Sequence, residues 1–144
     1  MKKRDVAEAI IINNKNEVLL QKKILDYLTV PGGYWNVFGG EIENGEIPEQ
    51  TLKREIEEEI GFNISKFKLS KIKDYKLPTA FYGKRYIFEG LFDQEISSII
   101  LKEGAGFAFF NISEINSIKV DPLCLEVLKE YFQEQQSLIT KKRN

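Results

Sequence analysis

The sequence predicts an α/β fold, because segments with strand and helix patterns alternate along the chain. Apolar runs of strand length occur on both sides of a helical stretch at residues 48–60, and a second helical stretch begins at Pro122. The chain has 144 residues, of which 42% are hydrophobic and 30% charged. That size and balance suit one compact unit with a core, so we expect residues 1–144 to form a single domain.

The N-terminal third predicts strands separated by turns. Residues 6–12 are rich in apolar side chains, 13–16 read as a polar turn, and 17–23 carry a second apolar run. We expect these two runs to form a hairpin. Residues 24–33 contain Pro-Gly-Gly and predict a loop, which ends at a short strand over 34–38.

The clearest element is a helix from Pro48 to Ile60. Helix-forming residues fill this stretch, proline stands at its start, where a missing N–H group costs little, and Gly61 follows its end. Its apolar positions form one stripe that we expect to be buried: Leu52, Ile56 and Ile60.

The rest of the chain predicts further strands and a closing helix. Strands are expected at residues 66–77, 81–92, 99–101 and 107–111. Ser113 begins a short helical turn. The terminal helix begins at Pro122 and carries apolar positions that suit packing on a sheet: Leu125, Val127, Leu128, Tyr131 and Phe132.

Three glutamates share one face of the predicted 48–60 helix. Glu55, Glu58 and Glu59 are spaced i, i+3 and i+4, and at about 100° per residue they fall beside the apolar stripe, whereas Glu57 points outward. A run of glutamates is commonly a solvated helix face. However, like charges at this spacing repel, and a hard divalent cation would compensate them.

The residues around this helix carry a family resemblance. The pattern G-x5-E-x7-R-E-U-x-E-E-x-G-U, with U a bulky aliphatic, is the signature of Nudix hydrolases. The chain matches it at Gly40, Glu46, Arg54, Glu55, Ile56, Glu58, Glu59 and Gly61. Only Phe62 departs from it, being aromatic. The resemblance implies an α/β/α sandwich with a mixed sheet.

The resemblance also implies a metal site. It places the divalent ions on Glu55, Glu58 and Glu59, helped by the main-chain carbonyl of Gly40, with Mg²⁺ as the expected ion and Mn²⁺ as an alternative. It assigns Arg54 and Glu46 as a supporting pair, in which the arginine holds the glutamates and Glu46 braces the loop.

The signature pattern from Gly40 to Phe62 is called the Nudix box below. The segment just before it resembles that of oxidised-purine nucleoside triphosphatases of the MutT class. The Trp-Asn-x-Phe-Gly-Gly arrangement implies that Asn36 reads the base, since an amide offers both a donor and acceptors to a purine. Alternatively, Asn36 caps a turn. Asp121 could also reach a base, but Asp-Pro at a helix start is typical of an N-cap, which we favour.

Two further positions follow from the resemblance. Lys22 and Lys23 end the second strand, where related hydrolases place a basic residue near the substrate, so either could contact a phosphate, with Lys23 as the leading candidate. Glu103 matches a loop glutamate that supplies a metal ligand or the general base in several subfamilies. Exposed lysines at a strand end and a surface glutamate are the plain alternatives.

Composition excludes several other functions. The chain has no histidine, which rules out a Ser-His-Asp triad and a His-ligated zinc site, and a single cysteine, Cys124, which rules out an internal disulfide. A net charge of −1 without a basic stripe gives no support for general nucleic-acid binding. No apolar run approaches membrane-spanning length, so we expect a cytoplasmic protein without a membrane partner.

The expected function is Mg²⁺-dependent hydrolysis of a small nucleotide. The leading substrate is a nucleoside triphosphate, with 8-oxo-dGTP as the candidate, cleaved to monophosphate and pyrophosphate, and the alternatives are ADP-ribose and a dinucleoside polyphosphate. A hypothesis of another class is a non-catalytic Nudix sensor domain, which usually carries substitutions in the Arg-Glu or Glu-Glu positions. The box here is intact. A homodimer is plausible by family analogy.

Overall fold

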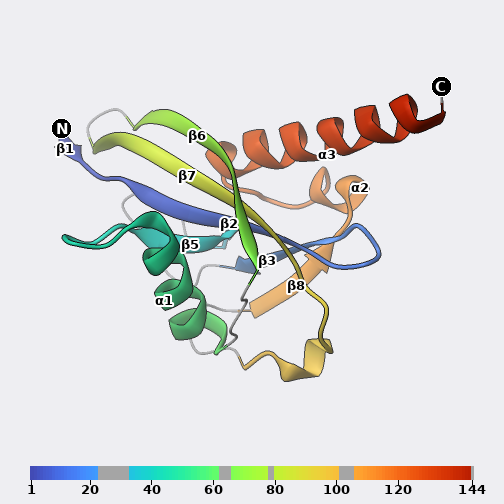
Figure 1. Ribbon diagram of the computed structural model, residues 1–144, viewed down its shortest axis with the longest axis horizontal. Coiled ribbons are helices and arrows are strands. Elements are labelled where there is room, and N and C mark those ends of the chain that lie inside the picture. Colours follow the sequence, from blue (N-terminus) through green and yellow to red (C-terminus); the bar gives the residue numbers. More distant parts are fainter. Residues whose placement is uncertain (23–32, 62–65, 78–79, 101–105, 144) are drawn as a thin grey trace.

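A computed structural model of the protein describes residues 1–22, 33–61, 66–77, 80–100 and 106–143. In this part of the chain a mixed β-sheet lies between helix α1 (Pro48–Ile60) on one face and helix α3 (Pro122–Arg143) on the other (Figure 1). This arrangement confirms the predicted α/β/α sandwich.

The sheet is built around strand β2. β2 runs parallel to β7 along one edge and antiparallel to β5 along the other, and β6 continues the sheet beyond β7. β3 carries the other end of the sheet, where it pairs with β4 and β8. The strands among the described residues are β1 (Lys2–Lys3), β2 (Val6–Ile12), β3 (Val18–Lys22), β4 (Trp35–Asn36), β5 (Phe38–Glu41), β6 (Phe67–Leu77), β7 (Phe81–Leu91) and β8 (Gly106–Phe110).

The predicted hairpin of β2 and β3 exists only at its turn. The side chain of Asn13 accepts hydrogen bonds from the N–H groups of Lys15 and Glu17, and Asn16 takes the left-handed conformation with φ of 59°. Beyond the pair Ile12–Val18 the strands separate, because β5 occupies the edge of β2 that a longer hairpin would need. β3 therefore leads away toward β4 and β8.

The strand expected over residues 34–38 is two strands. β4 pairs with β3, Val37 lies between, and β5 then pairs with β2. A change of pairing partner within seven residues leaves no trace in hydrophobic periodicity, so the sequence predicted one short strand.

Two apolar cores lie on opposite faces of the sheet. The core under α1 contains the three stripe residues Leu52, Ile56 and Ile60, all buried as predicted. The core under α3 contains the terminal-helix residues Val127 and Leu128. Cys124 is a free thiol buried in this second core, among apolar side chains.

The short helices differ in part from expectation. A 3₁₀ turn covers Ile96–Ser98, and Ile99 and Ile100 are not in a strand, so the strand expected over 99–101 is wrong for these two residues; Leu101 lies outside the described residues. Helix α2 covers Ile112–Ile115, close to the predicted turn.

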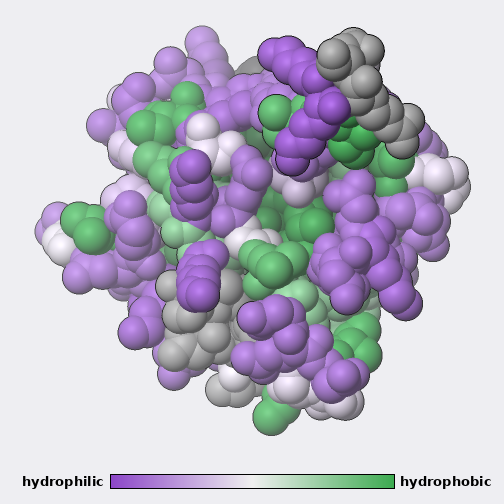
Figure 2. Space-filling view, turned by 45° about the vertical axis from the view of Figure 1, so that its right-hand side comes forward, coloured by the Kyte–Doolittle hydropathy of each residue, from purple (hydrophilic) through white to green (hydrophobic). Residues whose placement is uncertain are grey.

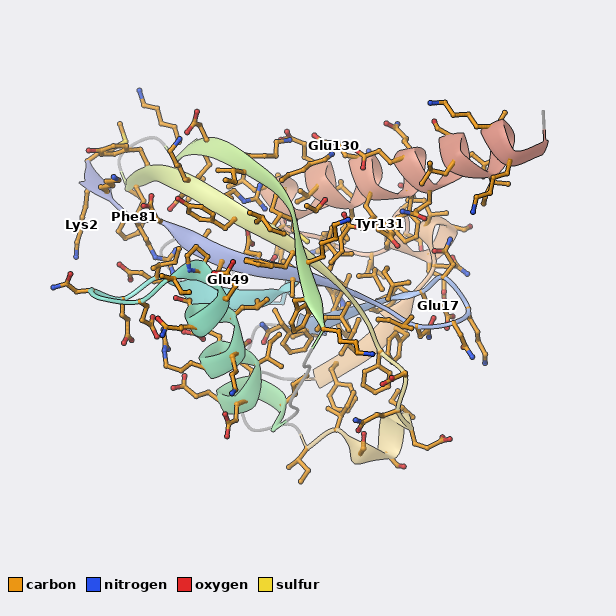
Figure 3. All side chains as sticks on the ribbon, in the orientation of Figure 1. Lys2, Glu17, Glu49, Phe81, Glu130 and Tyr131 are labelled. Atoms are coloured by element: carbon orange, nitrogen blue, oxygen red, sulfur yellow. The ribbon has the colours of Figure 1, made fainter. Side chains whose placement is uncertain are left out.

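Edge strand β6 is tied to α3 by charge. Lys71 and Lys73 both contact Glu130 of α3, which is labelled in Figure 3, and Lys73 also donates to Glu126 at 2.7 Å. These contacts hold α3 across the sheet.

Among the described residues, no helix combines the length and apolar character needed to cross a membrane. Figure 2 shows hydrophilic residues over much of one face, with hydrophobic residues in separate groups.

Candidate functional site

The predicted site is built on α1, whose two ends match the sequence prediction. Pro48 opens the helix, and the preceding Ile47 N–H donates to the side-chain oxygen of Gln50 at 2.9 Å. Gly61 ends the helix with φ of 63°, and its N–H donates to the carbonyl of Glu57. The buried stripe fixes the rotation of the helix, so the glutamate face is held next to β5.

Arg54 is the hub of the acidic face. Its guanidinium donates from Nε and Nη2 to the two oxygens of Glu46 at 2.8 and 2.9 Å, and from Nη1 to Glu55 at 2.9 Å. Glu58 and Glu43 lie 3.6 Å from the same guanidinium. One cation thus faces four carboxylates, which leaves this surface with excess negative charge.

Glu46 joins this hub to the loop before α1. The same carboxylate accepts hydrogen bonds from the Glu43 N–H and from the hydroxyl of Thr51, both at 2.9 Å. The hydrogen bonds from Arg54, and then that from the Glu43 N–H, lower the pKa of Glu46 from 4.5 to about 2. The pKa of Arg54 is raised in turn, first of all by its hydrogen bond to Glu46. Glu46 therefore braces the loop in its ionised form.

The three glutamates have different environments. The Glu58 side chain is 52% exposed and the Glu55 side chain 19% exposed, whereas Glu59 is buried at 2%. Glu59 accepts from the Gly39 N–H at 3.3 Å and from the side-chain amide of Gln21. Glu57 is exposed, as predicted. The face therefore grades from solvent at Glu58 to the protein interior at Glu59.

Two glycines bring the backbone of β5 against this face. A Cβ atom on Gly40 would lie 2.4 Å from the carboxyl carbon of Glu55, and one on Gly39 would lie 2.1 Å from the carbonyl oxygen of Ala7. Gly39 also has φ of 149°. Since only glycine avoids both contacts, the Gly39-Gly40 pair lets the main chain approach Glu55 closely.

The donor set suits a hard divalent ion. No three histidine, cysteine, aspartate or glutamate side chains in the described part of the chain form a metal cage by themselves. Magnesium does not need one, because it usually takes one or two carboxylates and completes its shell with water and substrate oxygens. The site matches this coordination preference. It has more carboxylates than Arg54 can neutralise, and the main chain at Gly40 lies close to Glu55.

Asn36 lies on the same face of the sheet as α1. It is the register partner of Gln21 in β3, is 8% exposed, and its side-chain oxygen accepts from the N–H of Val37 at 2.8 Å. This contact joins two neighbouring residues, and the amide group can still serve a ligand through its donors.

Asp121 caps α3. Its carboxylate accepts from the Cys124 N–H at 3.2 Å, which is the N-cap contact that we favoured, and its own N–H donates to the carbonyl of Trp35 at 3.0 Å. Trp35 thus links Asp121 to the strand of Asn36. Asp121 is 6% exposed, and burial raises the pKa of its carboxyl group.

Two predicted site residues, Lys23 and Glu103, lie outside the described residues. Lys22, at the end of β3, is exposed.

Sequence reasoning missed Gln21 and Thr51, both buried beside the acidic groups. Gln21 had a signal, since it is a polar residue at an inward position of an otherwise apolar strand. Thr51 had none, because threonine is ordinary in the first turns of a helix.

Comparison with known proteins decides the family. A family model described as NUDIX domain matches residues 2–131. The chain belongs to the NUDIX domain family. Within it, an 8-oxo-dGTP diphosphatase of Proteus vulgaris is 38% identical over 64 residues, 44% of this chain and 55% of the relative. An 8-oxo-dGTP diphosphatase of Escherichia coli (strain K12) is 36% identical over 83 residues, 54% of this chain and 59% of the relative.

Structural similarity extends over nearly all of the chain. The MutT protein from Methanosarcina mazei Go1 matches with a TM-score of 0.76 and 20% identity, covering 94% of this chain and 96% of that one. At this identity the likeness shows the fold alone. The sequence matches to the two diphosphatases span little more than half of their lengths, 55% and 59%.

Proposed function

We propose that this NUDIX domain hydrolyses a nucleoside triphosphate, with 8-oxo-dGTP as the first candidate, to the monophosphate and pyrophosphate in a Mg²⁺-dependent reaction. The observation that carries the proposal is the intact acidic face of α1, where Arg54 and Glu46 hold a surface with more carboxylates than cations. The two diphosphatase relatives support the nucleotide class.

In this proposal Glu55, Glu58, Glu59 and the carbonyl of Gly40 hold the metal. Bound divalent ions would lower the pKa of a water molecule, position it and neutralise charge on the phosphate oxygens. Glu58 is the most exposed of the three glutamates, so a metal ion that it holds can meet an incoming diphosphate first, whereas Glu59 is fixed in the interior. Arg54 keeps Glu55 oriented through its 2.9 Å hydrogen bond.

The base would be read near Asn36. Its strand pairs with β3 next to the α1 face, so a nucleotide with its phosphates at the acidic face can place its base toward β4. Asp121 serves first as the cap of α3 and is a secondary candidate for base contact. Lys23 is a candidate for a phosphate contact. Glu103 is a candidate for a further metal ligand or for the general base.

A product panel tests the proposal. Ordinary nucleotides, 8-oxo-dGTP, ADP-ribose and diadenosine polyphosphates are incubated with the protein in Mg²⁺ and in chelator, and each product is resolved by mass. The proposal predicts Mg²⁺-dependent release of pyrophosphate with preference for 8-oxo-dGTP. Turnover only of ADP-ribose or dinucleotides would contradict the substrate, and no turnover of any compound would favour a sensor domain.

A further inference from the structure

Gln21 occupies an unusual position for an amide. β3 alternates its side chains between the two cores, with Leu20 in the core under α3 and Leu19 in the core under α1. Gln21 follows on the α1 side and is 1% exposed. An apolar residue would continue the pattern there, and an uncompensated polar group would be costly.

The side chain of Gln21 connects two parts of the candidate site. Its amide nitrogen donates to one carboxylate oxygen of Glu59 and lies 3.4 Å from the carbonyl oxygen of Val37. The other carboxylate oxygen of Glu59 accepts from the Gly39 N–H. The amide thus spans from α1 to the segment between β4 and β5.

These contacts help to fix the orientation of a buried carboxyl group. Glu59 is 2% exposed, so water contributes little to holding its carboxylate, and the donors from Gln21 and Gly39 are among the groups that orient it. An ionised carboxylate has about four acceptor sites, so two N–H donors and a cation can share it. Groups that hydrogen-bond to metal-binding carboxylates orient them and tune their affinity.

We propose that Gln21 is a positioning residue, whose buried amide holds the Glu59 carboxylate in the orientation that binds the divalent ion. This inference rests on the proposed function, since it takes Glu59 as a metal ligand. It adds Gln21 of β3, which lies outside the helix that carries the glutamates, to the residues that set the affinity for the metal ion.

The test replaces the amide without changing its length. In Gln21→Met an unbranched side chain of similar size keeps the packing but removes the donor. We measure Mn²⁺ binding by calorimetry, kcat and KM for the best nucleotide, and thermal unfolding. The expected result is Mn²⁺ affinity about 10- to 100-fold weaker, the effect typical of such supporting groups. The lowered kcat should recover at high Mg²⁺, with KM for the nucleotide nearly unchanged.

Leu19→Ala is the matched control. Leu19 is buried two residues earlier on the same face of β3 and packs in the α1 core. It should lower the unfolding temperature without changing the Mn²⁺ affinity, which separates loss of packing from loss of positioning. Equal Mn²⁺ affinity in Gln21→Met and wild type would overturn the role of Gln21.

A measurement on the wild-type protein covers the case in which Gln21→Met fails to fold. The side-chain amide signals of Gln21 in a ¹⁵N spectrum should shift when Mg²⁺ is added, because the hydrogen-bonded carboxylate changes its charge distribution. Unmoved Gln21 signals while Mg²⁺ binds would reject the inference alone. If the wild-type protein binds neither Mn²⁺ nor Mg²⁺, the inference and the proposed function fall together.

Discussion

Three glutamates on one face of α1 lie in different surroundings. Glu58 reaches solvent, Glu55 is paired with Arg54, and Glu59 is enclosed between Gly39 and Gln21. Sequence spacing put all three on one face but could not grade their burial, which depends on how closely β3 and β5 approach α1. The partner of each glutamate, more than its position in the sequence pattern, sets its surroundings.

Arg54→Lys tests the hub. Lysine carries the same charge but cannot reproduce the fork by which Arg54 donates to both oxygens of Glu46. We expect kcat to fall about 10- to 100-fold, as for other residues that hold metal ligands. Lys53→Arg, at the exposed adjacent position, should leave kcat unchanged; if both variants kept full activity, the arrangement around Arg54 would have no catalytic importance.

The lowered pKa of Glu46 predicts that the stability of the folded protein depends on pH. Its pKa in the folded protein is about 2, below the ordinary value of 4.5, so its ionised form favours the folded state. That contribution is complete above about pH 4.5 and is lost as the pH falls toward about 2. Denaturant titrations at several pH values should therefore show the stability advantage of wild type over Glu46→Gln shrinking in this window, and a constant difference would contradict the assignment.

At the scale of elements, the helices followed from the sequence more closely than the sheet. α1 has a proline, a glycine and an apolar stripe that fix both ends and its buried face, so its bounds were predicted correctly. Strand pairing depends on distant segments. β3 separates from β2, and the chain changes partner at Val37, because β5 takes the edge of β2 while β4 and β8 pair with β3; no local pattern records these pairings.

The cap of α3 gives a prediction that separates two roles of Asp121. Asp121→Ala should lower the free energy of unfolding by about 1 kcal/mol, because the Cys124 N–H loses its acceptor. Asp121→Asn keeps an acceptor and should keep the stability. Urea denaturation measures both. If Asp121→Asn retains stability but alters the preference among purine nucleotides, Asp121 also reads the base.

At the scale of the whole molecule, the fold brings the box and the candidate base contact to the same side of the sheet. The family match ends at residue 131, while α3 continues to Arg143 and extends past the sheet (Figure 1). Residues 136–142 are exposed, including Leu138 and Ile139. This last part of α3 therefore makes little contact with the core.

A truncation after Gln136 should consequently leave the unfolding temperature and nucleotide turnover close to those of the whole chain. Truncation after Lys129 is the control, because it removes the buried Tyr131 and Phe132 and should destabilise the protein strongly. Marked loss of stability in the protein truncated after Gln136 would mean that Leu138 and Ile139 are covered in solution.

The central claim is that the glutamate face of α1 carries metal-dependent hydrolysis. The most direct test compares Glu58→Gln with Glu57→Gln, adjacent exposed positions of the same helix. In excess Mg²⁺, Glu58→Gln should lower turnover by about 100-fold or more. Mutation of residues that only hydrogen-bond to metal ligands already changes activity about 10- to 100-fold. Glu57→Gln should keep wild-type turnover, and both variants should unfold at the wild-type temperature. Full turnover by Glu58→Gln would contradict the account.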